Sequence, residues 1–173
     1  MLRSPAVWAA CAAVFAAACT PTYDWREIRV DPPGLTALLP CKPDRGVRTV
    51  SLAGTPVEVS MQGCERAGST FAVAWADLGD PARVEPALAQ WRDGAIAQLG
   101  AGAADVRTEP FSLQGATRVA GRVRARGTPP GGAPSEMRAA WFARGTQVFQ
   151  LIVVGAPIPD AAAESFFSEV RLR

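Results

Sequence analysis

The chain has 173 residues, of which 49% are hydrophobic and 20% charged, a composition typical of one globular domain rather than of a disordered protein. Its 18 basic and 16 acidic residues leave a formal net charge of +2, which is too balanced for a general nucleic-acid binder. The absence of histidine excludes Ser-His-Asp and Cys-His catalysis and histidine-ligated zinc.

The first 18 residues have the pattern of a signal peptide. Arg3 supplies a positive charge, and residues 6–18 form an uncharged stretch that is shorter than the roughly 20 residues a membrane-spanning helix needs. Three small residues, 16–18, stand directly before Cys19. This arrangement resembles the lipobox of bacterial lipoprotein precursors, although Ala16 stands where a leucine is usual. The resemblance implies that Cys19 is lipidated, with palmitate among the acyl chains, and becomes the new N-terminus.

Two other interpretations of the leader stay open. Residues 16–18 also fit ordinary signal cleavage, which gives a soluble periplasmic or secreted protein, and an uncleaved leader would act as a short anchor. For a lipoprotein, Thr20 after the cysteine, rather than Asp, favours the outer membrane of a bacterial envelope, with the body facing the periplasm. Several acyl chains, each contributing about 0.8 kcal/mol per buried CH₂, would hold it there.

Four cysteines are present, and one of them, Cys11, lies in the leader. Cys41 and Cys64 form an even pair in a chain bound for an oxidising compartment, which favours a disulfide. That bond would close a loop of about 24 residues and contribute roughly 3–4 kcal/mol. Two free buried thiols are the alternative, and the lack of a CxxC motif argues against a redox role.

The rest of the chain predicts one domain at 34–173, after a tether and candidate first strand at 19–33. Strands are expected at 25–30, 35–39, 47–52, 57–61, 71–75, 106–113, 116–126, 136–144 and 148–154, the last being central because it is the most apolar. A helix is expected from about Glu85 to Leu99, with Gly100 ending it and Gly94 marking a point of close packing. A second helix should follow at 161–170, with Asp160 as its cap. Because hairpins outnumber crossovers, this order predicts an α+β fold with an antiparallel sheet flanked by helices.

Four segments resemble the PsbP-like family of photosystem extrinsic subunits and small bacterial lipoproteins. They are LTALLP, TFAVAWADL, WFARGTQVFQLIVVG and ESFFSEVRL, and together they extend from Gly34 to Leu172. The resemblance is one of apolar strands and a terminal helix, without a catalytic motif. It implies a helix-covered antiparallel sheet and a non-enzymatic role, and it assigns no ligand site.

Arginine supplies all but one of the basic residues, and several arginines gather on the two strands joined by the loop at 127–134. If Arg126 faces Glu136, one side of this hairpin carries a basic strip. Its members are Arg118, Arg122, Arg124, Arg138 and Arg144, with Arg124 opposite Arg138 and Arg118 opposite Arg144. The strip is either a patch for an anionic partner, such as a phospholipid headgroup or an acidic protein, or a solvated face of an arginine-rich protein.

No catalytic motif is visible. Asp80 has the position of a helix cap, the serines lie outside any GxSxG motif, and the two adjacent glycines at 131–132 belong to no phosphate loop. The sequence therefore predicts a non-catalytic accessory or binding module of the envelope, without metal, cofactor or nucleic acid. Its partners are the membrane, through the lipid anchor, and an envelope protein. The alternatives are a secreted carrier of a small ligand, with a dry cavity behind Trp75 or Trp141, and a small carboxylate-dependent hydrolase or transferase.

Overall fold

The computed structural model describes residues 21–30, 32, 34–102 and 105–173. The predicted leader and Cys19 lie outside this range, so the prediction of lipidation is not addressed by the fold. Within the described residues, no helix is both long and apolar enough to cross a bilayer.

The main structural element is a seven-stranded antiparallel sheet. Its strands, in spatial order, are β3 (Asp44–Leu52), β4 (Thr55–Arg66), β5 (Ser69–Asp77), β9 (Gln147–Gly155), β8 (Ser135–Arg144), β7 (Arg118–Gly127) and β6 (Val106–Glu109). The apolar strand β9 pairs with β5 on one side and β8 on the other, so its predicted central place is confirmed. Both edge strands, β3 and β6, pair on one side only.

A second, three-stranded sheet is formed by β1 (Arg26–Val30), β2 (Leu35–Leu39) and β10 (Arg171–Leu172). The predicted strands at 25–30 and 35–39 are therefore confirmed, and they pair with each other. β10 was not predicted. It joins the free side of β2, where the amide of Arg173 also donates to the carbonyl of Gly34 at 2.9 Å.

Two α-helices and one short 3₁₀ helix connect the strands: η1 (Pro81–Arg83), α1 (Val84–Leu99) and α2 (Asp160–Ser168). Asp80 caps η1, because its Oδ1 accepts from the amide of Ala82 at 2.9 Å. Pro86 lies in the first turn of α1, where its missing N–H costs no intrahelical bond. Gly100 ends α1 with a φ of 69°, a conformation that favours glycine, as predicted.

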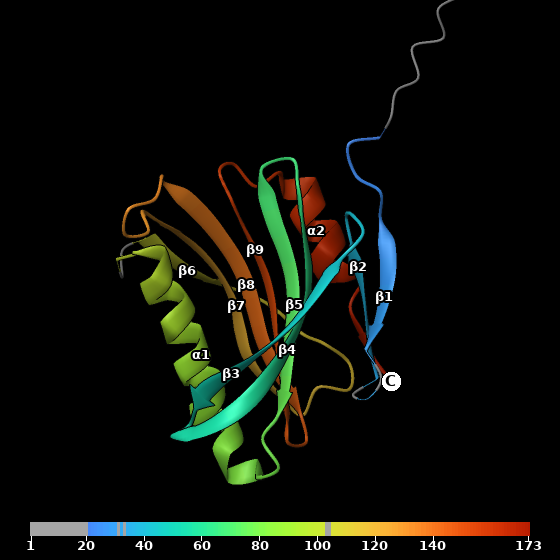
Figure 1. Ribbon diagram of the computed structural model, residues 1–173, viewed down its shortest axis with the longest axis vertical. Coiled ribbons are helices and arrows are strands. Elements are labelled where there is room, and N and C mark those ends of the chain that lie inside the picture. The colour runs from blue at the N-terminus through green and yellow to red at the C-terminus, as the bar shows by residue number, and fades with distance from the viewer. Residues whose placement is uncertain (1–20, 31, 33, 103–104) are drawn as a thin grey trace, which may run out of the picture.

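The seven-stranded sheet is covered on both faces, as Figure 1 shows, with α1 on one face and α2 together with the small sheet on the other. Strand β5 alternates between the two cores. Phe71 and Val73 pack toward α2 and β2, whereas Ala74 and Ala76 pack toward α1. This explains why β5 reads as an almost unbroken apolar run, because both of its faces are buried.

The predicted fold class is wrong. In the described part of the chain, about 50% of the residues are in strands and 19% in helices, and these residues form two antiparallel sheets with only two α-helices, so this part is a β-rich fold rather than one helix-flanked α+β sheet. The hairpin pattern correctly indicated antiparallel pairing. The sequence predicted a single sheet, whereas β1, β2 and β10 form a separate sheet that takes up part of the face expected to be covered by helices.

The predicted disulfide between Cys41 and Cys64 is confirmed, with the two Cα atoms 6.0 Å apart. Cys41 follows β2 and Cys64 lies in β4, so the bond joins the small sheet to the large one. Nearby, the Nε of Arg66 donates to the carbonyl of Thr22 at 2.6 Å, which attaches the segment before β1 to the same strand.

Candidate functional site

The hairpin of β7 and β8 has the predicted register at its loop end. Arg126 lies opposite Glu136, and Arg124 lies opposite Arg138. Two arginines directly across from each other are unfavourable unless carboxylates or solvent separate their charges. The structure supplies carboxylates, from β6, β8 and the first turns of α2.

The register changes farther along the hairpin, where a β-bulge lies between Val119 and Gly121. Arg118 is therefore opposite Ala143, and the predicted pairing of Arg118 with Arg144 is wrong. One extra residue reverses which side of the sheet a side chain faces. Arg118 accordingly forms an ion pair with Glu85 of α1 at 3.0 Å, on the face opposite α2.

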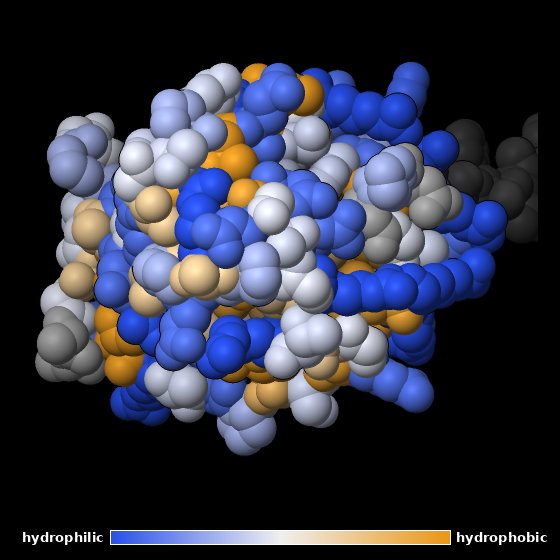
Figure 2. Space-filling model, turned by 90° about the horizontal axis from the view of Figure 1, so that it is seen from below, coloured by the Kyte–Doolittle hydropathy of each residue, from blue (hydrophilic) through white to orange (hydrophobic). Residues whose placement is uncertain are grey.

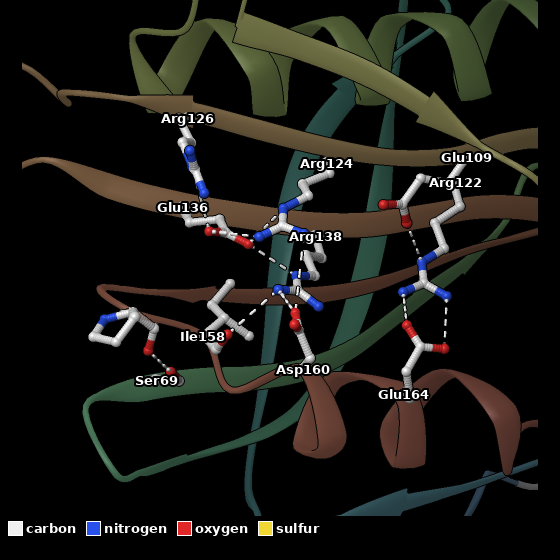
Figure 3. Close-up of polar contacts among 11 residues, drawn as sticks. Ser69, Glu109, Arg122, Arg124, Arg126, Glu136, Arg138, Ile158, Asp160 and Glu164 are labelled. Carbon is white, nitrogen blue, oxygen red and sulfur yellow. Dashed lines mark hydrogen bonds and ion pairs between the residues drawn. The ribbon is translucent and has the colours of Figure 1, made fainter.

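Arg138 is 97% buried and lies between two carboxylates (Figure 3). Its Nε donates to Glu136 at 2.9 Å, and one NH₂ group donates to Asp160 and, at 3.3 Å, to the carbonyl of Ile158. Arg124 contacts the same Glu136, with its Nε 2.9 Å from Oε1. The opposed arginines thus share Glu136, and each also lies close to Asp160.

These contacts keep the carboxylates ionised. Burial alone would raise the pKa of Glu136, but hydrogen bonds from Arg138 and Arg124 outweigh it and lower the pKa below its ordinary value. A hydrogen bond from Arg138 lowers the pKa of Asp160 in the same way. For Arg138, burial would lower the pKa, but its bonds to Asp160 and Glu136 raise it overall.

Arg122 is the second buried cation of the hairpin. Its two terminal nitrogens donate to the two carboxylate oxygens of Glu164 on α2. Its Nε lies 2.9 Å from a carboxylate oxygen of Glu109 on β6. Its guanidinium stacks 4.4 Å from the ring centre of Phe167. The Nε contact with Glu109 is an ion pair without hydrogen-bond geometry. The hydrogen bond from Arg122 lowers the pKa of Glu164 despite partial burial.

We call these residues, together with Arg126, the arginine–carboxylate cluster. Its members are Arg122, Arg124, Arg126, Arg138, Glu109, Glu136, Asp160 and Glu164. Positive and negative groups balance, so the cluster mainly holds α2 against β7 and β8. Arg144, at the end of β8, lies apart from it and close to Gly34. The basic strip as a site for an anionic partner stays a prediction, but four of its five arginines already bind carboxylates of this chain.

A cavity of about 450 Å³ lies beside the cluster, between the segment at 110–114 and α2. Arg122 and Glu164 stand in its wall, where they satisfy each other, and Phe111 and Phe167 give it an apolar side. No group of three or more metal-binding side chains occurs among the described residues. The two charged groups Arg122 and Glu164 in the wall of this cavity therefore neutralise each other.

A second concavity, which the sequence analysis did not identify, lies between the edges of the two sheets. This groove of about 410 Å³ is lined by Arg29 of β1, by Arg45 and Val47 of β3, by Gln62 of β4 and by Trp75 of β5. Trp75 thus borders an open groove rather than a dry cavity, whereas Trp141 is fully buried in the core under α1.

Gln62 is the unusual residue of this groove. Its side chain is 95% buried, and its Oε1 has no hydrogen-bond partner in the described part of the chain. A buried acceptor without a donor costs about 1–3 kcal/mol, so most such groups in folded proteins are paired. No sequence signal marked this residue, because the groove brings together residues of β1, β3, β4 and β5.

One face of the molecule, seen in Figure 2, shows no broad apolar area. In the view of Figure 2, apolar residues appear as separate patches among charged and polar ones. The large hydrophobic side chains with most exposure are Val47, Val50, Met61 and Val119. Three of the four belong to β3 and β4, at the side of the molecule where the groove opens.

The comparisons with known proteins leave the chain without an assigned relative. It matches no family model, and it has no match among the curated proteins or the solved structures. The PsbP-like resemblance therefore gains no support from these comparisons.

Proposed function

We propose that the protein is a lipoprotein of a bacterial envelope, anchored through Cys19 in the outer membrane, whose folded body is a non-catalytic module that binds a partner in the periplasm. The observation that carries this proposal is the leader, in which a short apolar stretch and three small residues end at Cys19. The disulfide between Cys41 and Cys64 supports it, because such bonds persist mainly in oxidising compartments.

The electrostatics of the arginine–carboxylate cluster argue against general acid catalysis by its carboxylates. A general acid near neutral pH needs a carboxyl group whose pKa is raised. In the arginine–carboxylate cluster, the pKa values of Glu136, Asp160 and Glu164 are all lowered, because each carboxylate accepts hydrogen bonds from arginine. These groups hold elements together as permanent anions.

The anchor can be tested by expressing the full-length chain in a bacterium that processes lipoproteins and measuring its intact mass and its membrane partition. We expect the protein to lose its first 18 residues, gain the mass of acyl chains and sediment with the membrane. Cys19→Ser should abolish the added mass and release the body. Cys11→Ser is the matched control, because it removes a leader thiol without touching the lipidation position.

The proposal fails if the wild-type chain is found in the cytosol with its leader intact, or if Cys19→Ser carries the same acyl mass as wild type. A cleaved but unlipidated chain in the periplasm would also contradict it, in favour of ordinary signal cleavage.

A further inference from the structure

Strand β3 has an open edge. It is the outermost strand of the large sheet and pairs only with β4, in an unbroken register from Asp44 to Leu52. Besides that ladder, the hydrogen bonds to its backbone among the described residues are at its end, where Gln90 and Arg83 donate to the carbonyls of Ser51 and Leu52. The segment before Ser51 therefore presents unpaired N–H and C=O groups.

Natural edge strands are usually protected by bulges, by proline, or by being short or covered. β3 has nine residues, no proline and no bulge, and every side chain from 44 to 51 is exposed. Val47 is 59% exposed and Val50 is 37% exposed. At Gly46 even a Cβ would meet no atom within 4 Å, so the face of the sheet is open at this residue as well.

The charges of this edge are mostly positive. Arg45 and Arg48 have no ion-pair partner among the described residues, and Asp44, at the first position, is the one acidic side chain on the strand. Arg45 lines the groove between the two sheets, as does Arg29 of β1, whose Nε is paired with Glu27 at 2.9 Å. The edge thus complements a segment that carries carboxylates.

The groove adds an unsatisfied hydrogen-bond acceptor next to the edge. Gln62 is paired through its backbone with Arg45 of β3, so its amide lies one strand in from the edge, beside Val47 and Trp75. Rotation about the terminal amide torsion of glutamine exchanges Oε1 and Nε2, so Oε1 can be turned toward the groove that Gln62 lines. A side-chain hydroxyl or amide of a neighbouring segment could then supply the missing donor.

From these observations we propose that the edge of β3 is a docking site for an extended acidic peptide segment of a partner protein, which adds an eighth strand to the large sheet. Backbone hydrogen bonds along β3 provide affinity, while Arg45, Arg48 and the groove at Gln62 provide selectivity. This inference rests on the proposed role as a binding module and names its partner class.

The edge itself specifies the probe. An antiparallel segment should place apolar residues opposite apolar ones and acidic residues opposite basic ones. The chosen pairs are Val opposite Val50, Thr opposite Thr49, Glu opposite Arg48, Val opposite Val47 and Glu opposite Arg45. A fluorescently labelled Val-Thr-Glu-Val-Ser-Glu peptide meets these requirements, and Val-Thr-Lys-Val-Ser-Lys is its charge-reversed control. Binding of both peptides to the full-length chain can be measured by fluorescence anisotropy at low salt.

We expect the acidic peptide to bind in the micromolar range and the basic peptide at least tenfold more weakly. Val47→Glu should weaken binding about tenfold, because it places a like charge at the centre of the edge. The matched control is Val119→Glu, another exposed valine, on β7 at the far side of the sheet, which should leave binding unchanged. Arg45→Gln is a second edge variant, with an exposed side chain whose loss leaves the core intact.

The variant Gln62→Met distinguishes a role of Gln62 in peptide binding from a role in stability, because the two measured effects should have opposite directions. Removing the unpaired acceptor should raise the melting temperature, and losing one hydrogen bond to the peptide should weaken binding about fivefold.

The proposal is overturned if the acidic peptide does not bind at concentrations up to about 1 mM, if both peptides bind equally, or if Val47→Glu and Val119→Glu behave alike. Because the anchoring test reads acyl mass and this test reads peptide binding, each proposal can fail while the other stands.

Discussion

Glu136 is the central residue of the arginine–carboxylate cluster, because Arg124, Arg126 and Arg138 all lie within ion-pair distance of its carboxylate. Replacing it with glutamine leaves Arg138, which is 97% buried, with one carboxylate fewer. Removing one partner of a buried ion pair leaves a charge uncompensated. We expect Glu136→Gln to lower the free energy of unfolding by about 3 kcal/mol, measured by urea denaturation at pH 7.

The same cluster predicts a loss of stability in acid. The pKa values of Glu136, Asp160 and Glu164 are lowered in the folded protein, so folding favours their ionised forms. Their contribution is complete above the unfolded-state pKa and disappears as pH falls through the lower folded-state values. Melting temperatures should therefore fall from about pH 5 to about pH 3. Glu136→Gln should flatten this slope and Glu58→Gln, an exposed residue of β4, should not; equal slopes would contradict the prediction.

Among the elements, α1 has an unexpected weak point. The sequence predicted close packing at Gly94, and this is wrong, because a Cβ there would meet no neighbouring atom within 4 Å. The residue therefore reduces helix stability without a packing benefit. Gly94→Ala should raise the free energy of unfolding by about 0.5–1 kcal/mol in chemical denaturation. Ala97→Gly, at an exposed position of the same helix, is the reverse control and should lower it by a similar amount.

Local patterns predicted the elements well, because most strands and both helices follow from periodicity within their own segments. β4 contains the strand predicted at 57–61, and α1 ends where Gly100 predicted the end of a helix. The bulge in β7 was missed, although Gly121 carried a signal for it. Its φ of 103° is a conformation that favours glycine, and an isolated glycine inside a strand often marks a bulge.

The candidate sites depend on contacts between distant segments, which single-segment patterns cannot predict. The arginines of β7 and β8 were identified, but their partners Glu109, Asp160 and Glu164 come from β6 and α2. Likewise, nothing in the sequence around Gln62 shows that β1 crosses near it to form the groove. Local sequence thus indicated where charge lies, but not what neutralises it.

At the scale of the whole molecule, the disulfide is a covalent cross-link between the two sheets, in addition to the backbone that runs from β2 to β3. Closing this loop restricts the unfolded chain and stabilises the protein by about 3 kcal/mol. We expect the double variant Cys41→Ala, Cys64→Ala to lose that amount in urea denaturation. Reductant should destabilise the wild type similarly and leave the double variant unchanged. If reductant leaves the free energy of unfolding of the wild-type protein unchanged, the two sheets are held together by packing alone.

The pairing of β2 with β10 has a consequence for the timing of folding. β2 is made early and can form a hairpin with β1 at once, but its other side stays unfilled until almost all of the described chain has been synthesised. α2, which packs on the same core, also comes late. The nascent chain therefore cannot complete the small sheet and its core before β10 has been synthesised. In a chain that is still crossing a translocation pore, the side of β2 that pairs with β10 would remain exposed.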